Sequence, residues 1–254
     1  MKGLIAAILG VLAVAATARD VTVIGEVHDN PAHHALQAER VAAIRPAGLV
    51  FEMLTFDQAG AVTPQNRDDP EALAKALDWA ASSWPDFTMY YPIFAAAPGA
   101  RIFGAGLTRE AARAAMNGGN AGPVTGEAAA FNLDRPLPKS QQAAREALQM
   151  QAHCNALPKD MLPGMVRVQR LRDAMLARAT LRAYRQTGGP VVVITGNGHA
   201  RRDWGMSAYL SRVAPGLDIH VIGQTEDGAP LSGTFDEVLS APAVDREDPC
   251  AAFR

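Results

Sequence analysis

The chain has 254 residues, with 24 lysines and arginines against 26 aspartates and glutamates, which gives a formal net charge of −2. Its 48% hydrophobic and 20% charged residues are close to the averages of globular proteins, which excludes a wholly disordered chain. The near-neutral charge gives no electrostatic reason to expect nucleic acid as a partner. Its 22 glycines and 17 prolines follow no period, which excludes collagen-like and low-complexity architectures.

Residues 1–18 have the pattern of a secretory signal peptide. Lys2 is followed by an uninterrupted small and apolar run from Leu4 to Ala16, and Ala16-Thr17-Ala18 matches an A-x-A cleavage site. The run of about thirteen residues is shorter than the roughly twenty that cross a bilayer. We therefore expect export to the periplasm and a mature chain that begins near Arg19. No cysteine for lipid attachment follows the run, and we expect no membrane span after cleavage.

The rest of the chain alternates strand and helix signals, which predicts an α/β domain over residues 19–254 with a mostly parallel central sheet flanked by helices. The predicted strands are Val21–Glu26, Gly48–Leu54, Arg101–Gly104, Pro190–Thr195 and Asp218–Gly223. The predicted helices are Pro31–Ile44, Pro70–Trp79, Arg109–Met116, Lys139–His153, Gly164–Tyr184 and Met206–Val213. Within the fourth strand, Val191–Ile194 is continuously apolar, as in a strand that is covered on both faces.

The alternation stops over residues 138–187, where only two long helical patterns occur. We interpret this segment as a helical insertion that caps the carboxyl edge of the strands. Its second helix has an apolar stripe that includes Val168, Leu171 and Met175. Its arginines are read as a solvated basic face.

Cys154 and Cys250 are the two cysteines of the chain. In an oxidising compartment an even pair is most simply a disulfide, which would tie the C-terminal tail to the middle of the chain. The alternative is that one thiol serves as a ligand or a nucleophile.

One motif, Gly-x-x-His, occurs at two predicted strand ends, as Gly25-Glu26-Val27-His28 and as Gly196-Asn197-Gly198-His199. Because the carboxyl ends of parallel strands share one edge, we expect His28 and His199 to lie on one rim. Glu26, beside the first histidine, and Glu52, at a third strand end, would complete a divalent-metal set. A single such histidine would more simply cap a turn.

The remaining histidines carry weaker signals. His33 and His34 open the first helix, where exposure to solvent is as plausible as a ligand role. His220 lies within the last predicted strand and is read as structural. His153 adjoins Cys154 and is kept as a haem or metal ligand candidate.

Further short motifs stand in order along the chain, namely Gln37, Phe51-Glu52-Met53, Trp84-Pro85-Asp86-Phe87, His153-Cys154, Met161-Leu162-Pro163-Gly164-Met165, Arg172-Asp173 and Asp248-Pro249-Cys250. With the paired Gly-x-x-His motif, they resemble the ChaN family of haem-binding uptake proteins, from about residue 20 to the end. That family is similar to the Tiki metalloproteases and the erythromycin-esterase-like enzymes, whose active sites use paired Gly-x-x-His motifs and glutamates. The resemblance implies an α/β core, a helical cap, and haem or metal between them.

Haem needs axial ligands and a flat apolar slot with donors for its propionates. Here His28 or His199 would supply an imidazole, and Tyr90 or Tyr91 a phenolate. The candidates that line the slot or pair with propionates are Trp84, Phe87, Met161, Met165, Asn197, Arg172, Arg201 and Arg202. For the two methionines, ordinary core packing is the other interpretation.

Two functions follow from these residues. In the first, the protein binds haem or iron for uptake or storage, and Glu26 and Glu52 matter little, because carboxylates are poor haem ligands. In the second, it is a hydrolase in which His28, His199 and the two glutamates hold a divalent ion that activates water. The resemblance favours haem. A homodimer that shares the ligand is left open, and a serine esterase is disfavoured because no Gly-x-Ser-x-Gly occurs.

Overall fold

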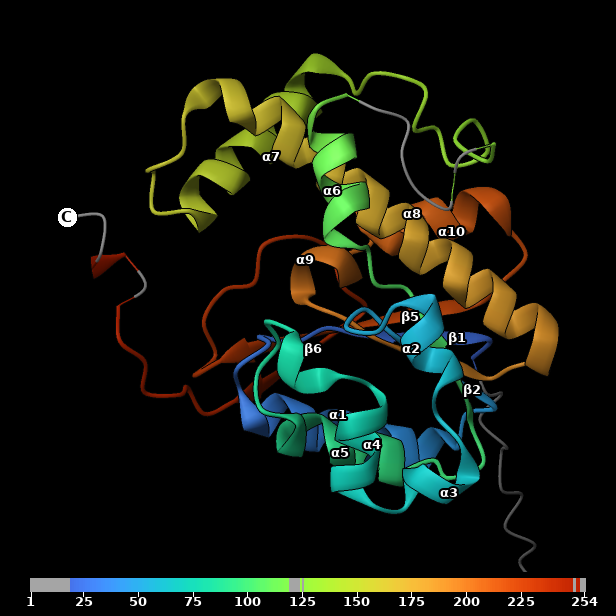
Figure 1. Ribbon diagram of the computed structural model, residues 1–254. Coiled ribbons are helices and arrows are strands. Elements are labelled where there is room, and N and C mark those ends of the chain that lie inside the picture. Colours follow the sequence, from blue (N-terminus) through green and yellow to red (C-terminus); the bar gives the residue numbers. More distant parts are fainter. Residues whose placement is uncertain (1–18, 119–123, 125, 249, 252–254) are drawn as a thin grey trace, which may run out of the picture.

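Six short parallel strands form the centre of the protein in this computed structural model, which describes residues 19–118, 124, 126–248 and 250–251 (Figure 1). The predicted signal peptide lies outside the described residues. The strands are β1 (Val21–Ile24), β2 (Gly48–Phe51), β3 (Arg101–Gly104), β4 (Val191–Ile194), β5 (Ile219–Glu226) and β6 (Glu237–Ala241). The five predicted strands are confirmed. The sixth was missed because β6 is an edge strand of alternating burial without a continuous apolar run.

The strands are arranged in the order β3-β2-β4-β1-β5-β6, and every ladder is parallel. β1 therefore pairs with β4 on one side and with β5 on the other, with Val21 opposite Val191 and Ile219. From β1 the chain continues to β2 on one side of the sheet, and from β4 it continues to β5 on the other side. The connections that follow the adjacent strands β1 and β4 therefore run in opposite directions. Such a switch point is where open α/β sheets bind ligands.

Helices and short helical turns connect the strands. They are α1 (Pro31–Ile44), α2 (Phe56–Gly60), α3 (Pro64–Arg67), α4 (Pro70–Ala76), η1 (Trp79–Ala81), α5 (Phe87–Ala95), α6 (Arg109–Met116), α7 (Lys139–Ala152), η2 (Lys159–Met161), α8 (Leu162–Thr187), α9 (Asn197–Ala200) and α10 (Met206–Val213). The six predicted helices are present, but α5 was missed because Pro92 lies inside it. Its first turn is fixed by Asp86, which accepts from the backbone N–H of Thr88.

The two faces of the sheet carry separate cores, so the domain has three layers (Figure 1). Alternate strand residues such as Val21 and Val23 pack with α6, α8 and α10. The intervening positions, including Ile24 and Ile194, pack with α1, α4 and α5. This alternation follows from the two-residue period of a strand and explains why every residue of β1 and β4 is buried.

Helix α8 was predicted to have an apolar stripe and a solvated basic face. Its predicted apolar stripe is confirmed, because Val168, Leu171 and Met175 are buried in the core. The prediction of a solvated basic face is wrong at Arg170, which is buried and donates to the backbone carbonyls of Asn132 and Arg135. Among the described residues, no helix is both long and apolar enough to span a membrane.

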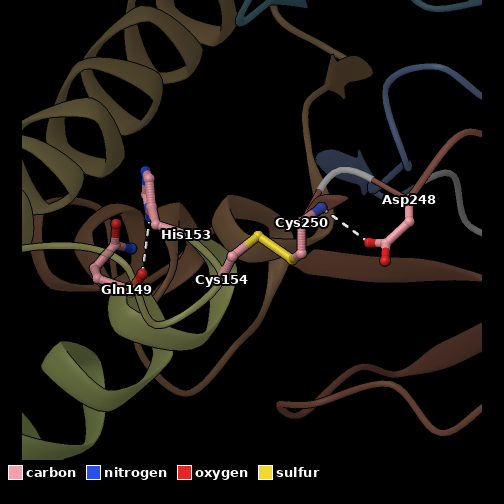
Figure 2. The surroundings of a disulfide bond; sticks show 5 residues. All are labelled: Gln149, His153, Cys154, Asp248 and Cys250. Atoms are coloured by element: carbon pink, nitrogen blue, oxygen red, sulfur yellow. Dashed lines mark hydrogen bonds between the residues drawn. A yellow bond between two sulfur atoms is a disulfide. The ribbon is translucent and has the colours of Figure 1, made fainter. Parts of the chain in front are cut away.

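The C-terminal tail is fastened at two points after β6. Arg246 forms ion pairs with Asp29 at 2.7 Å and with Glu226 at 2.6 Å, and these contacts lower the pKa of both carboxyl groups. Cys250 is disulfide-bonded to Cys154 at the end of α7, with a sulfur–sulfur distance of 2.04 Å (Figure 2). The predicted disulfide is thus confirmed, and it closes a sequence separation of 96 residues.

Candidate functional site

Both Gly-x-x-His motifs lie at the switch point between β1 and β4. Gly25 to His28 follow β1 directly, and Gly196 to His199 form the turn and short helix α9 after β4. The backbone joins the two loops, because Asn197 donates its N–H to the carbonyl of Glu26 at 3.0 Å. A side chain at Gly25 would place its Cβ 2.4 Å from Oδ1 of Asn197, so the close approach requires glycine there.

The first half of the site is built around the buried carboxylate of Glu26. Its Oε1 lies 2.7 Å from Nδ1 of His28 and accepts from the hydroxyl of Tyr90 at 2.8 Å. Its Oε2 accepts from Nε2 of Gln37 at 2.7 Å. Because a carboxylate only accepts, Nδ1 of His28 carries a hydrogen. The bond fixes the orientation of the ring and leaves Nε2 as the nitrogen that can bind a ligand.

Nε2 of His28 faces a space that is open because residue 196 is a glycine. A Cβ at Gly196 would lie 2.9 Å from this nitrogen, so any other residue would fill that space. The His28 ring meets Trp84 edge to face, with 4.9 Å between centroids. About a third of the imidazole remains accessible, with 36% of the side chain exposed. The ring is therefore held by Glu26 at Nδ1 and is accessible at Nε2.

The second half of the site is a histidine between two acids. Nδ1 of His199 lies 2.7 Å from Oδ1 of Asp173 in α8, and its Nε2 lies 3.7 Å from Oε1 of Glu52. The other oxygen of Glu52 accepts from the hydroxyl of Thr195 at 2.6 Å and from the N–H of Gly196 at 2.9 Å. His199, Asp173 and Glu52 are all buried. The predicted convergence of the two histidine motifs with Glu26 and Glu52 is what the structure shows.

The charges of these groups favour protonated rings. Burial would lower the pKa of His28, but the hydrogen bond to Glu26 and the charge of Glu52 outweigh it, so the pKa is raised. Burial likewise opposes the charge of His199, yet Glu52 and Asp173 raise its pKa. Burial would raise the pKa of Glu52, but the two imidazolium charges bring it down to about 2. A metal ion that binds His28 must therefore displace a proton.

Three polar aromatic residues near the site, Tyr90, His33 and His34, are buried. Tyr90 is fully buried, and burial together with the charge of Glu26 raises the pKa of its hydroxyl. To serve as a phenolate ligand, Tyr90 would have to break its hydrogen bond to Glu26 and ionise while buried. His33 and His34 are buried rather than exposed, which corrects the solvent-exposed interpretation. His33 accepts from Val27 N–H at 2.9 Å, and His34 Nε2 lies 2.8 Å from the carbonyl of His28.

The other predicted pocket residues are spread more widely. Trp84 contacts His28, but Phe87, the first residue of α5, is buried in the core. Met161 is 38% exposed in η2, and Met165 is half-buried in α8. His153 is half-buried, with Nδ1 at 2.8 Å from the carbonyl of Gln149 beside the disulfide (Figure 2).

Asn197 and the adjacent arginines are largely engaged in fixed contacts. Asn197 binds the backbone of Gln224 through both side-chain atoms, at 2.7 Å and 3.0 Å. Arg201 pairs with Asp203 at 2.6 Å, and Arg202 pairs with Asp236. Arg172 differs, because its Nη1 lies 4.0 Å from Glu52 and its side chain is 29% exposed.

Sequence reasoning missed Asp173, which binds His199, and Gln37, which binds Glu26. Asp173 and Gln37 belong to the motifs that carry the family resemblance, but no role was predicted for either. Asp173 is two positions from both Leu171 and Met175, so it lies on another face of α8, where Val166, Arg170 and Ala177 are also buried. In the described part of the chain, no group of three or more His, Cys, Asp or Glu side chains is arranged to hold a metal ion. The divalent-metal alternative, with Glu26 and Glu52 as catalytic groups, therefore gains no support.

The structure defines a parallel α/β protein with two carboxylate-held imidazoles at its switch point. Residues 12–210 match the family model for haem-binding uptake proteins of the Tiki superfamily, ChaN. The match covers most of the chain, which therefore belongs to this family.

One solved structure shares this fold. The structure of ChaN from Campylobacter jejuni with cofacially bound haem is 18% identical, covers 85% of this chain and 86% of that chain, and has a TM-score of 0.66. The type III effector HopBA1 is a more distant match, with 15% identity over 88% of each chain and a TM-score of 0.45. No curated protein matches the chain.

Proposed function

We propose that this protein is an exported haem-binding protein that serves haem uptake or storage, and that it binds haem at the switch-point rim through His28. The observation that carries the proposal is that one nitrogen of the His28 ring is hydrogen-bonded and the other faces open space. Its Nδ1 is bonded to Glu26 at 2.7 Å, while no partner in the described residues occupies Nε2. Family membership and the haem-bound relative from Campylobacter jejuni support haem as the ligand.

The donor set at the rim fits a haem group. An imidazole is a common axial ligand of haem iron, and a carboxylate on its other nitrogen strengthens it as a donor. The space that a Cβ at Gly196 would fill lies directly beside Nε2. Trp84 presents an aromatic surface next to the ring. When bound, haem would supply the iron that the protein carries.

The second half of the site would set the charge around the ligand. His199 is held between Asp173 and Glu52 and is buried, so it acts as a fixed positive group rather than as an open ligand. Among the three arginines considered for the propionates, Arg201 and Arg202 already have aspartate partners. Within the described part of the chain, Arg172 has no contact shorter than 4.0 Å to an acid, so it is the best donor for a propionate.

Export is proposed on two observations. The apolar run and the A-x-A site in residues 1–18 have the form of a signal peptide. The disulfide between Cys154 and Cys250 fits an oxidising compartment, because such bonds are rare in the reducing cytosol of mesophiles. The periplasmic fraction of a bacterial culture expressing the full chain should contain a protein whose N-terminus lies near Arg19. A full-length protein confined to the cytosol would contradict export.

Hemin titration tests the ligand. The wild type should give a saturable and shifted Soret band. His28→Ala should lose that shift, because the open nitrogen is removed. His220→Ala is the matched control, since His220 lies towards the opposite end of β5 and pairs with Glu237 at 3.3 Å. Unchanged binding in His28→Ala would refute this site, and no saturable binding in the wild type would refute the function.

A further inference from the structure

A cavity lies at the edge of the sheet, beside β3 and away from the histidine rim. Its volume is about 830 Å³, and it is lined by residues of α2, α3, β3 and α8. This volume lies within the range of about 300–1,000 Å³ that is usual for small-molecule pockets. No residue of the His28 and His199 site lines it. We name it the edge cavity. Figure 1 shows α8 passing α2, and Arg182 of α8 lies 4.3 Å from the ring centroid of Phe56 in α2.

The edge cavity carries an excess of positive charge. Among the described residues, its lining includes Arg67, Arg101, Arg178 and Arg182 but only one acid, Asp57. Arg178 pairs with Glu127 at 2.8 Å. Within the described residues, neither Arg101 nor Arg182 has a carboxylate partner.

Arg67 adds a buried charge to the wall of the edge cavity. The side chain is 7% exposed and donates to the carbonyls of Phe94, Ala97 and Ala100, none of which carries a negative charge. Its Nε has no hydrogen-bond partner in the part of the chain that the structure describes. Burial lowers the pKa of the guanidinium, although the charge of the neighbouring Asp68 acts in the opposite direction. A buried cation without a paired acid favours an anion nearby.

The rest of the lining is apolar. Phe56 is 57% exposed at the opening, although a ring of this size is usually buried. Ile102, Phe103, Met175 and Ala179 continue the surface inwards. The guanidinium groups stack on this surface, with Arg182 over Phe56 and Arg101 over Phe103 at 5.4 Å. Stacked arginines keep their N–H edges free for an acidic group.

We propose that the edge cavity binds a small amphipathic monocarboxylate, with its acid group between Arg101 and Arg182 and its hydrocarbon part against Phe56 and Phe103. The charge selects an acid, and the apolar lining selects a ligand with a hydrocarbon body. Asp57 in the same lining disfavours a second negative charge. This site is separate from the haem site, so either can fail without the other.

The test uses 1-anilinonaphthalene-8-sulfonate as a fluorescent reporter, with octanoate and 1-octanol as competitors of equal chain length. Octanoate should displace the reporter from the wild type, whereas 1-octanol should displace it at least tenfold less well. The double variant Arg101→Gln/Arg182→Gln should weaken octanoate binding about tenfold or more, because charge-assisted hydrogen bonds are lost. Arg185→Gln is the matched control, since it removes one charge from the same helix outside the cavity lining.

Circular dichroism and hemin titration of the double variant should match the wild type, which separates this site from the haem site. Equal displacement by octanoate and 1-octanol would overturn the proposal, because the charge would then play no part. Octanoate binding that is as strong in the double variant as in Arg185→Gln would overturn it as well.

Discussion

Replacing Glu26 by glutamine tests how the site prepares His28. The two carboxylate oxygens of Glu26 accept from three donors, on His28, Tyr90 and Gln37, at 2.7 Å, 2.8 Å and 2.7 Å. An amide offers one oxygen and one NH₂ group, so at least one of these donors must face another donor. If the NH₂ group faces His28, Nδ1 has to accept, the hydrogen moves to Nε2, and that nitrogen can no longer bind iron.

The magnitude follows from the burial of this carboxylate, whose side chain is 0% exposed. Each hydrogen bond to a charged group contributes about 1.5–3 kcal/mol, so loss of one bond should lower the free energy of unfolding by about 2–3 kcal/mol. Haem affinity should fall by about 10–100-fold, the usual effect of removing a group that orients a metal-binding histidine.

The assay combines urea unfolding with hemin titration of Glu26→Gln. Glu39→Gln, an exposed change in the same helix as Gln37, is the matched control and should resemble the wild type. If Glu26→Gln bound hemin as tightly as the wild type, with the same Soret band, the argument that Glu26 prepares His28 would be refuted.

Three further predictions concern the rim and the tail. Gly196→Ala places a methyl group 2.9 Å from Nε2 of His28 and should weaken hemin binding at least tenfold in the titration, while Gly198→Ala, where a Cβ meets nothing within 4 Å, should not. The Cys154→Ser/Cys250→Ser variant should lose up to about 4.7 kcal/mol in urea unfolding, since the disulfide closes a long loop; a loss below 1 kcal/mol would contradict this. Arg246→Gln should cost about 1 kcal/mol at neutral pH. Because Arg246 lowers the pKa of its two carboxylate partners, this cost is fully present above their unfolded values of 3.8 and 4.5 and should fade as the pH falls below them; a cost that persists at pH 2 would contradict the ion pairs.

The sequence predicted those parts of the fold that have a local signal. β1 and β4 are continuous β-branched runs, and the glycines after them mark the turns that carry His28 and His199. Their strand-end positions were enough to predict that the paired motif lies on one rim. β6 and α5 lack such a signal, because β6 alternates at an edge and α5 contains Pro92.

The partners of the two histidines could not be predicted in the same way. Tyr90 lies 64 residues from Glu26, and Asp173 lies 26 residues from His199, so only the folded chain brings them together. From sequence alone, Glu26 was expected to matter little for haem. The structure changes that expectation, because Glu26 binds the nitrogen of His28 that does not face the open space.

The most direct test of the central claim is the position of iron in crystals of the protein with hemin. An anomalous difference map at the iron absorption edge locates the metal without assumptions about the porphyrin. The account predicts iron bonded to Nε2 of His28, beside Gly196. Iron bonded to His153 or Tyr91, or lying in the edge cavity instead of at the rim, would contradict it.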